Sequence, residues 1–210
     1  LGVIALMEDR RPLADRMRPE TLDDIVGQDK WIGPGAPIRE TIENGHVQSL
    51  LLWGPPGCGK TTLAQCIAST SDLRFAKLSA VLDGIKQLRQ IIDTAETMQR
   101  MENRPTLLFV DEIHRWNKAQ QDALLPHVEN GLIVLIGATT ENPSFEVIPA
   151  LRSRVRLVRL EPLQVNDIKT LLQRGLTEGL GHRKVSITDE GLQWIAQAAG
   201  GDARRALSDM

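Results

Sequence analysis

The chain has 210 residues, of which 41% are apolar and 25% charged, and its formal net charge is -2. This composition is typical of an ordinary globular protein and argues against a wholly disordered or fibrous chain. The small net charge excludes a basic electrostatic field over the whole protein, so a nucleic-acid site would have to be a local basic patch. Because aromatic residues are scarce, aromatic stacking platforms for single-stranded nucleic acid are not expected.

Five short apolar runs alternate with helical segments over the first 160 residues. Between the runs, apolar residues recur at spacings of three and four over 85–98 and over 119–128, which predicts amphipathic helices. Continuously apolar strands that alternate with helices predict a parallel sheet covered on both faces. The predicted strands are 49–53, 75–78, 106–110, 132–136 and 156–160.

The pattern changes after the last predicted strand. Helical periods over 168–172 and 192–198 predict two helices, and Asp202 begins a third. We therefore predict an α/β domain over 1–160 and a small all-helical domain over 161–210, which is truncated at its C-terminal end.

The cysteines and the hydropathy of the sequence indicate in which cellular compartment the protein is expected. Cys58 and Cys66 are eight residues apart, about 12 Å if both lie on one helix, which is too far for a disulfide. The absence of a disulfide framework favours a reducing, intracellular compartment. No apolar run reaches about 18 residues, so we predict no membrane-spanning helix and no membrane partner.

Arginines gather near the start of the chain, at Arg10, Arg11, Arg16 and Arg18. We expect them to form a solvated basic arm, with contact to DNA as the alternative.

The segment 54–61 reads Gly-Pro-Pro-Gly-Cys-Gly-Lys-Thr and matches the phosphate-binding P-loop motif G-x-x-x-x-G-K-[ST]. Its glycines let backbone N–H groups surround phosphates, and the helix that follows adds the positive end of its dipole. The motif predicts that Lys60 reaches the β- and γ-phosphates of a nucleotide and that the Thr61 hydroxyl ligates Mg2+. The nucleotide-binding residues predicted here are Gly54, Pro55, Pro56, Gly57, Cys58, Gly59, Lys60, Thr61 and Thr62.

The predicted strand 106–110 is followed by the acidic pair Asp111 and Glu112. An apolar strand that ends in two carboxylates is the expected second half of a P-loop nucleotidase. Asp111 is predicted to orient Mg2+ and its waters, and Glu112 to polarise the water that attacks the γ-phosphate.

A GTPase is the competing interpretation. Asn117 and Lys118 begin the guanine-reading motif Asn-Lys-x-Asp, but Gln120 replaces its Asp. The segment also follows the acidic pair too closely, so we predict ATP as the nucleotide and Mg2+ as its metal.

Taken together, these motifs resemble the AAA+ ATPases of the clamp-loader and RuvB type, and within them the replication-associated recombination protein family with the Werner-helicase-interacting proteins as eukaryotic relatives. The string 138–145, Ala-Thr-Thr-Glu-Asn-Pro-Ser-Phe, separates this family from RuvB, which shares Asp-Glu-Ile-His. Cys58 and Trp116 depart from the usual Thr and Phe without removing a required donor or charge. The resemblance is carried by 12–19, 26–28, 54–61, 78–81, 111–122, 137–145 and 201–207.

The resemblance implies a parallel five-stranded sheet sandwiched by helices, a helical lid, and roles for residues that spacing alone does not assign. Thr140 corresponds to the polar sensor 1 residue, and Arg204 to sensor 2, which reaches the phosphates from the lid. Arg154 corresponds to the arginine finger that completes a neighbouring subunit's site in trans, with Arg152 as the fallback. The segment that wraps adenine and ribose is matched by Met17, Arg18, Val26 and Gly27.

The function implied by the resemblance is an ATP-hydrolysing AAA+ module that acts in DNA replication and recombination at stalled or damaged forks. The implied partners are DNA at a fork or single-strand/double-strand junction, single-strand DNA-binding protein, replisome components, and further copies of the chain assembled through a region largely missing here. The implied location is cytoplasmic and nucleoid-associated in a bacterium, or nuclear in a eukaryote. Two alternatives stay open: a nucleotide-switched binding module with little turnover, and a clamp-loader or RuvB-like motor subunit.

Overall fold

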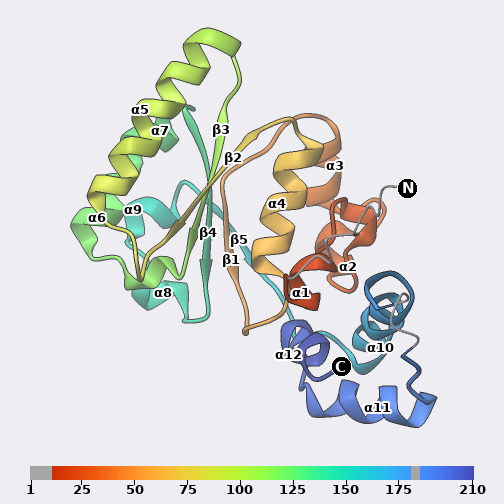
Figure 1. The fold of residues 1–210 in the computed structure, drawn as a ribbon. Helices are drawn as coiled ribbons and strands as arrows, with labels where there is room; N and C mark the ends of the chain where they lie inside the picture. The colour runs from red at the N-terminus through yellow and green to blue at the C-terminus, as the bar shows by residue number, and fades with distance from the viewer. Residues whose placement is uncertain (1–10, 181–184) are drawn as a thin grey trace, which may run out of the picture.

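The computed structural model describes residues 11–180 and 185–210. Its strands form one parallel sheet in the order β2-β3-β4-β1-β5 (Figure 1). This order confirms the predicted parallel five-stranded sheet. The strands are β1 (Leu50–Trp53), β2 (Arg74–Ser79), β3 (Thr106–Asp111), β4 (Ile133–Thr139) and β5 (Arg156–Arg159).

Helices cover both faces of the sheet, with α3 and α4 on one side and α5 and α7 on the other (Figure 1). None of the helices in the described ranges is long and apolar enough to cross a membrane. The helical segments are α1 (Leu13–Arg16), η1 (Leu22–Asp24), α2 (Asp29–Ile32), α3 (Pro37–Glu43), α4 (Lys60–Thr70), α5 (Ile85–Glu102), η2 (Ile113–Arg115), α6 (Lys118–Asp122), α7 (Leu125–Glu129), α8 (Pro143–Glu146), α9 (Pro149–Arg152), α10 (Val165–Arg174), η3 (Gly175–Gly179), α11 (Asp189–Ala198) and α12 (Ala203–Ser208).

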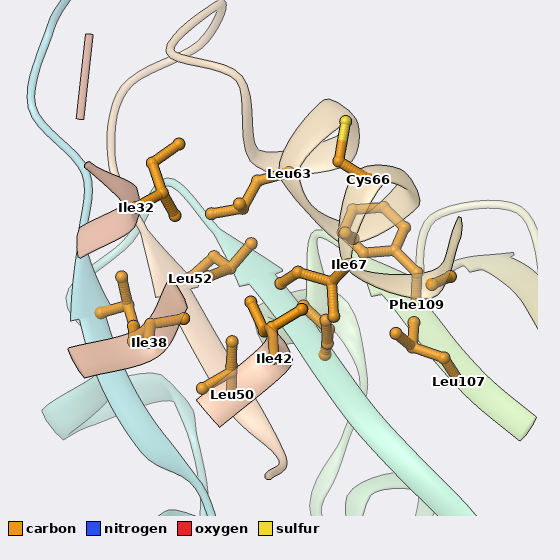
Figure 2. Close-up of a cluster of buried hydrophobic side chains, with 14 of the residues drawn as sticks. Ile32, Ile38, Ile42, Leu50, Leu52, Leu63, Cys66, Ile67, Leu107 and Phe109 are labelled. Atoms are coloured by element: carbon orange, nitrogen blue, oxygen red, sulfur yellow. The ribbon is translucent and has the colours of Figure 1, made fainter. Parts of the chain in front are cut away.

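Successive residues of β3 supply two apolar cores on opposite faces of the sheet. Leu107 and Phe109 pack in the core beneath α3 and α4, which Figure 2 shows in detail. Leu108 and Val110 pack in the core beneath α5. Because both faces are buried and side chains alternate between them, the strand is apolar without interruption.

Strand β4 runs three residues beyond its predicted end at Ile136, through Gly137 and Ala138 to Thr139. Gly137 pairs with Leu51 of β1, and a Cβ at Gly137 would lie 3.0 Å from the Leu51 side chain. Glycine therefore permits the Leu51 side chain to pack closely against the middle of β4, although the predicted strand ended just before this glycine.

The single helix predicted over 119–128 is wrong, because the structure has two helices there. Helix α6 ends at Asp122, and α7 starts at Leu125 with Pro126 in its first turn. Proline lacks an N–H donor and clashes with the preceding turn, so it is tolerated at a helix start and ends the helix before it.

The helices after β5 pack around an apolar cluster of their own, which includes Ile168, Leu192 and Ala206. Leu13 and Met17 of the N-terminal segment pack against this cluster, and Figure 1 shows α12 beside α1. The three predicted helices are therefore present as α10, α11 and α12. The domain boundary at residue 160 stays a prediction.

Candidate functional site

The loop between β1 and α4 has a backbone shape that requires glycine. Gly57 has φ +71° and Gly59 has φ +99°, in the left-handed region that other residues rarely adopt. Gly59 caps α4, and no atom lies within 4 Å of the place where its Cβ would be. The loop is therefore open on this side of Gly59, as an anion-binding loop requires.

Lys60 is the first residue of α4, and its side chain folds back along the loop. Its Nζ donates to the carbonyl oxygens of Gly54 at 2.8 Å and Pro55 at 2.9 Å, and the residue is only 8% exposed. A buried ammonium has to be hydrogen-bonded. The group carries three N–H donors, so these two bonds leave one for a phosphate.

Cys58 is buried inside the same loop, with its Sγ 3.1 Å from the position of a Cβ on Gly54. Burial raises the pKa of the Cys58 thiol, and it raises the pKa of Cys66 to about 11. Both cysteines are free, as predicted. Cys58 therefore acts as a small apolar residue that packs the loop from within.

The acidic pair ends β3 in an uncommon backbone conformation. Asp111 is the last residue of the strand, and Glu112 has φ +52°, unusual for a residue other than glycine. Lys77 Nζ lies 4.0 Å from the Asp111 carboxylate, whose side chain is 31% exposed. Asp111 is thus accessible from the pocket described below, which it lines together with Thr61.

One carboxylate oxygen of Glu112 has two polar neighbours. Thr140 Oγ1 donates to Glu112 Oε2 at 3.2 Å. His114 Nδ1 lies 3.2 Å from the same oxygen and 3.0 Å from Thr139 Oγ1. The end of β4 therefore contacts the acidic pair directly, which orients Glu112.

A single pocket gathers the phosphate-binding loop, the acidic pair, the N-terminal segment and the helices after β5. It thus brings together residues from both ends of the described chain. The predicted site residues that line it are Met17, Arg18, Val26, Pro56, Gly57, Cys58, Gly59, Lys60, Thr61, Thr62, Asp111, Glu112 and Arg204.

Four predicted residues lie just behind the pocket wall. The carbonyl oxygens of Gly54 and Pro55 accept hydrogen bonds from Lys60, and the Thr140 hydroxyl donates one to Glu112. Gly27 has φ +74°, and its Cβ would fall 2.9 Å from the Leu163 side chain, so this turn presses against the chain that leads into α10.

Arg154 lies away from the pocket, just after α9. It forms an ion pair with Glu129 at the end of α7 and donates to the Ala150 carbonyl at 2.6 Å. Arg152 instead donates to the Ser144 carbonyl at 2.9 Å. An arginine that is exposed and outside its own pocket is compatible with action on another subunit, and that role stays a prediction.

The expected solvated arm is wrong for Arg16 and Arg18. Arg16 Nη1 donates to the Gly179 carbonyl at 2.9 Å, and Arg18 Nη1 donates to Gln65 Oε1 at 3.2 Å. The reason is that α1, which carries Arg16, docks on the helices after β5, whereas Arg18 reaches α4. Arg10 lies outside the described residues.

Gln28 is a site residue that the sequence did not single out for a role. Its side-chain amide donates to the Glu161 carbonyl at 2.7 Å and to the Cys58 carbonyl at 3.5 Å, and it accepts from Glu161 N at 3.2 Å. Gln28 therefore ties the N-terminal segment to the chain leaving the sheet. No periodicity or motif marks such a bridge.

The residues present fit Mg2+. Thr61 and Asp111 line the same pocket, and Mg2+ is typically held by one or two side chains together with phosphates and water. Over residues 11–180 and 185–210, no group of three or more His, Cys, Asp and Glu side chains is arranged to hold a metal alone. The donor set is therefore one that a nucleotide would complete.

Residues 50–163 match the family model described as ATPase family associated with various cellular activities. The chain is 48% identical over 203 residues to replication-associated recombination protein A of Escherichia coli strain K12, covering 95% of this chain and 45% of that protein. It is 43% identical to ATPase WRNIP1 of Dictyostelium discoideum, covering 94% of this chain and 23% of that protein. The chain thus spans less than half the length of these relatives.

A solved structure of the Thermotoga maritima RuvB Holliday junction branch migration motor superimposes on the chain with a TM-score of 0.74. The two are 32% identical, and the match covers 91% of this chain and 63% of that one. The likeness extends from the sheet into the helices that follow it.

Proposed function

Because the chain belongs to the AAA family of ATPases, whose model matches 50–163, we propose that it is the ATP-hydrolysing module of a protein that maintains DNA replication and recombination. The identities to replication-associated recombination protein A confirm the resemblance predicted from the sequence. The proposal concerns the activity and its substrate. It rests chiefly on one observation, the pocket that gathers the phosphate-binding loop, the acidic pair and Arg204.

The chemistry proposed for this pocket follows from its side chains. Lys60 and Arg204 carry positive charge to the phosphates of ATP, where charge develops during phosphoryl transfer. Thr61 and Asp111 would hold Mg2+, which when bound neutralises phosphate charge. Glu112, which accepts a hydrogen bond from Thr140 through one oxygen, would take a proton from the attacking water.

We propose that Arg154 completes the pocket of a neighbouring subunit. It is exposed, lies outside its own pocket, and is paired with Glu129 at the surface. A finger supplied in trans makes turnover depend on assembly. ATPase activity per subunit should therefore rise with the concentration of the full-length protein.

The DNA partner is proposed from the names of the relatives and from one surface of this chain. The turn after β2 exposes Val81 and Leu82, which are 58% and 83% accessible. The Trp116 indole donates to the Asp83 carbonyl at 3.0 Å, so this turn is joined to the segment that follows the acidic pair. Exposed basic residues flank this junction: Lys86 and Arg89 lie at the start of α5, and Arg115 and Lys118 follow the acidic pair.

None of these four basic side chains is in an ion pair with another described residue. Unpaired basic side chains around an apolar turn suit the binding of a nucleic-acid strand. The basic side chains would pair with its phosphates, and the apolar side chains would contact its bases. We propose a fork or junction as the preferred DNA. Single-strand DNA-binding protein and replisome components are further proposed partners, and the cytoplasm, near the nucleoid, is the proposed location in a bacterium.

Steady-state phosphate release by the full-length protein, with and without forked DNA, tests this proposal. Turnover that depends on Glu112 and is changed by DNA supports it. ATP binding with negligible turnover at every protein concentration would favour the alternative, a nucleotide-switched assembly module. Translocation on DNA with steady turnover would favour the RuvB-like motor instead.

A further inference from the structure

His114 contacts the acidic pair, yet it does not line the pocket. It lies in the short turn η2, and its side chain is 12% exposed. Its neighbour Ile113 is fully buried, and Trp116 is 3% exposed and bonded to the turn after β2. The backbone that carries the imidazole is therefore fixed from both sides.

The contacts of Nδ1 determine where the imidazole proton lies. Nδ1 is 3.2 Å from Glu112 Oε2 and 3.0 Å from Thr139 Oγ1. An ionised carboxylate can only accept hydrogen bonds. The lone pair of an unprotonated Nδ1 would therefore be repelled by the negative charge of Glu112. The Thr139 hydroxyl has its own acceptor, the Glu141 carbonyl at 3.2 Å. Nδ1 is therefore the protonated nitrogen.

With this proton, the imidazole bonds the Thr139 hydroxyl and keeps the positive end of its N–H near Glu112 Oε2, which lies 3.2 Å from Nδ1 and also receives a hydrogen bond from Thr140. The two groups come from different parts of the chain, since His114 lies in η2 and Thr140 directly follows β4. A hydrogen bond and a neighbouring N–H dipole at one oxygen oppose rotation of the carboxylate and leave its second oxygen for water. A carboxylate held in this way does not have to be ordered at the moment of reaction.

We propose that His114 is a positioning residue, which in its Nδ1–H form holds Glu112 in place for the attacking water. The inference rests on the proposed function of Glu112. It assigns His114 no proton transfer, since the imidazole is not among the residues that line the pocket.

The tautomer can be measured without nucleotide. In 15N-histidine-labelled full-length protein near pH 8, the imidazole nitrogens report directly which of them is protonated, and His114→Asn identifies the signal. We expect a protonated Nδ1 and a bare Nε2. A protonated Nε2 with a bare Nδ1 would overturn the inference, whatever the protein's ATPase activity.

Turnover supplies the second test, with two variants at the same position. His114→Ala removes the donor and should lower kcat about tenfold to a hundredfold, with the KM for ATP within about twofold of the parent. His114→Asn carries an amide N–H near the place of Nδ1 and should restore most of kcat. Equal loss in both variants, at equal thermal stability, would contradict a donor role, and so would an unchanged kcat in His114→Ala.

The variant Glu112→Gln separates this inference from the proposed function on which it rests. If Glu112→Gln retains full turnover, the proposed role of Glu112 fails and the positioning role fails with it. If Glu112→Gln is inactive but His114→Ala is not, only the role of His114 fails. When His114 acts through Glu112, adding His114→Ala to Glu112→Gln should cause no further loss in the residual rate.

Discussion

Gly57 of the phosphate-binding loop lies directly against Asp202, the residue that caps α12. A Cβ on Gly57 would fall 2.8 Å from the Asp202 Cα, and the N–H of Ala203 donates to the Gly57 carbonyl at 3.3 Å. Helix α12 carries Arg204 and therefore rests on the loop that would hold the phosphates. A change in the position of one element has to be accommodated by the other.

Replacing Gly57 by Ala should disturb this contact. The substitution places a side chain at φ +71°, which costs about 1–2 kcal/mol, and it also displaces Asp202. Gly59→Ala is the matched control, since Gly59 has φ +99° but no atom within 4 Å of its Cβ position. We expect a larger drop in the thermal unfolding temperature for Gly57→Ala in nucleotide-free protein. Equal drops would mean that α12 does not press on the loop in solution.

Lys60→Ala should abolish tight nucleotide binding. The substitution removes the ammonium that is predicted to contact the β- and γ-phosphates, a charge-assisted bond. Titration calorimetry with ATP and Mg2+ should find affinity reduced at least tenfold, which is about 1.4 kcal/mol. Affinity within about threefold of the parent would contradict the assignment of the loop.

Glu112→Gln should bind ATP normally and scarcely hydrolyse it. The amide keeps the size of the side chain but cannot accept a proton from water, so turnover should fall about a hundredfold or more. Calorimetry and phosphate release on the same preparation separate binding from chemistry. Turnover near that of the parent would move the water-activating role to another residue, and His114 would then be tested as the base.

The sheet and the chemistry of the loop were predictable because they depend on local patterns. An apolar run such as 106–110 can be buried on both faces only as a central strand. Gly57 and Gly59 are required by the left-handed backbone geometry of the loop that the motif encodes. The site residues that the motifs name accordingly lie in or beside one pocket.

Contacts between distant segments were not predictable. The bridge from Gln28 to Glu161 joins residues 133 positions apart, and neither residue type favours the other in sequence. His114 was set aside as a base, and its contact with Glu112 depends on the left-handed turn at Glu112. The split of the helix at Pro126 did have a signal, the proline itself, which the apolar periodicity outweighed.

The surface around Val81 and Leu82 yields a prediction about DNA. The double variant Lys86→Glu/Arg89→Glu reverses two charges in the first turns of α5, and it should weaken binding of forked DNA at least tenfold and lower the salt slope by about two. Arg100→Glu is the matched control, because it reverses an exposed charge at the far end of the same helix. Fluorescence anisotropy at several salt concentrations measures both quantities. Similar losses in the two proteins would show a general charge effect.

Arg154→Ala tests the finger. The residue lies outside its own pocket, so ATP affinity should stay within about twofold of the parent. Fingers of this type contribute on the order of a thousandfold or more to turnover, so hydrolysis should nearly vanish. Arg152→Ala is the comparison, since Arg152 is bonded to the Ser144 carbonyl within its own chain.

Mixing two inactive proteins decides whether Arg154 acts in trans. In full-length chains, a Lys60→Ala subunit has no working pocket but keeps Arg154, whereas an Arg154→Ala subunit keeps its pocket. At a mixed interface the first subunit supplies its arginine to the second, so phosphate release should partly return in proportion to mixed interfaces. If the mixture stays inactive although the proteins demonstrably co-assemble, Arg154 does not complete a neighbouring pocket, and the same mixing experiment with Arg152→Ala becomes the test of the alternative.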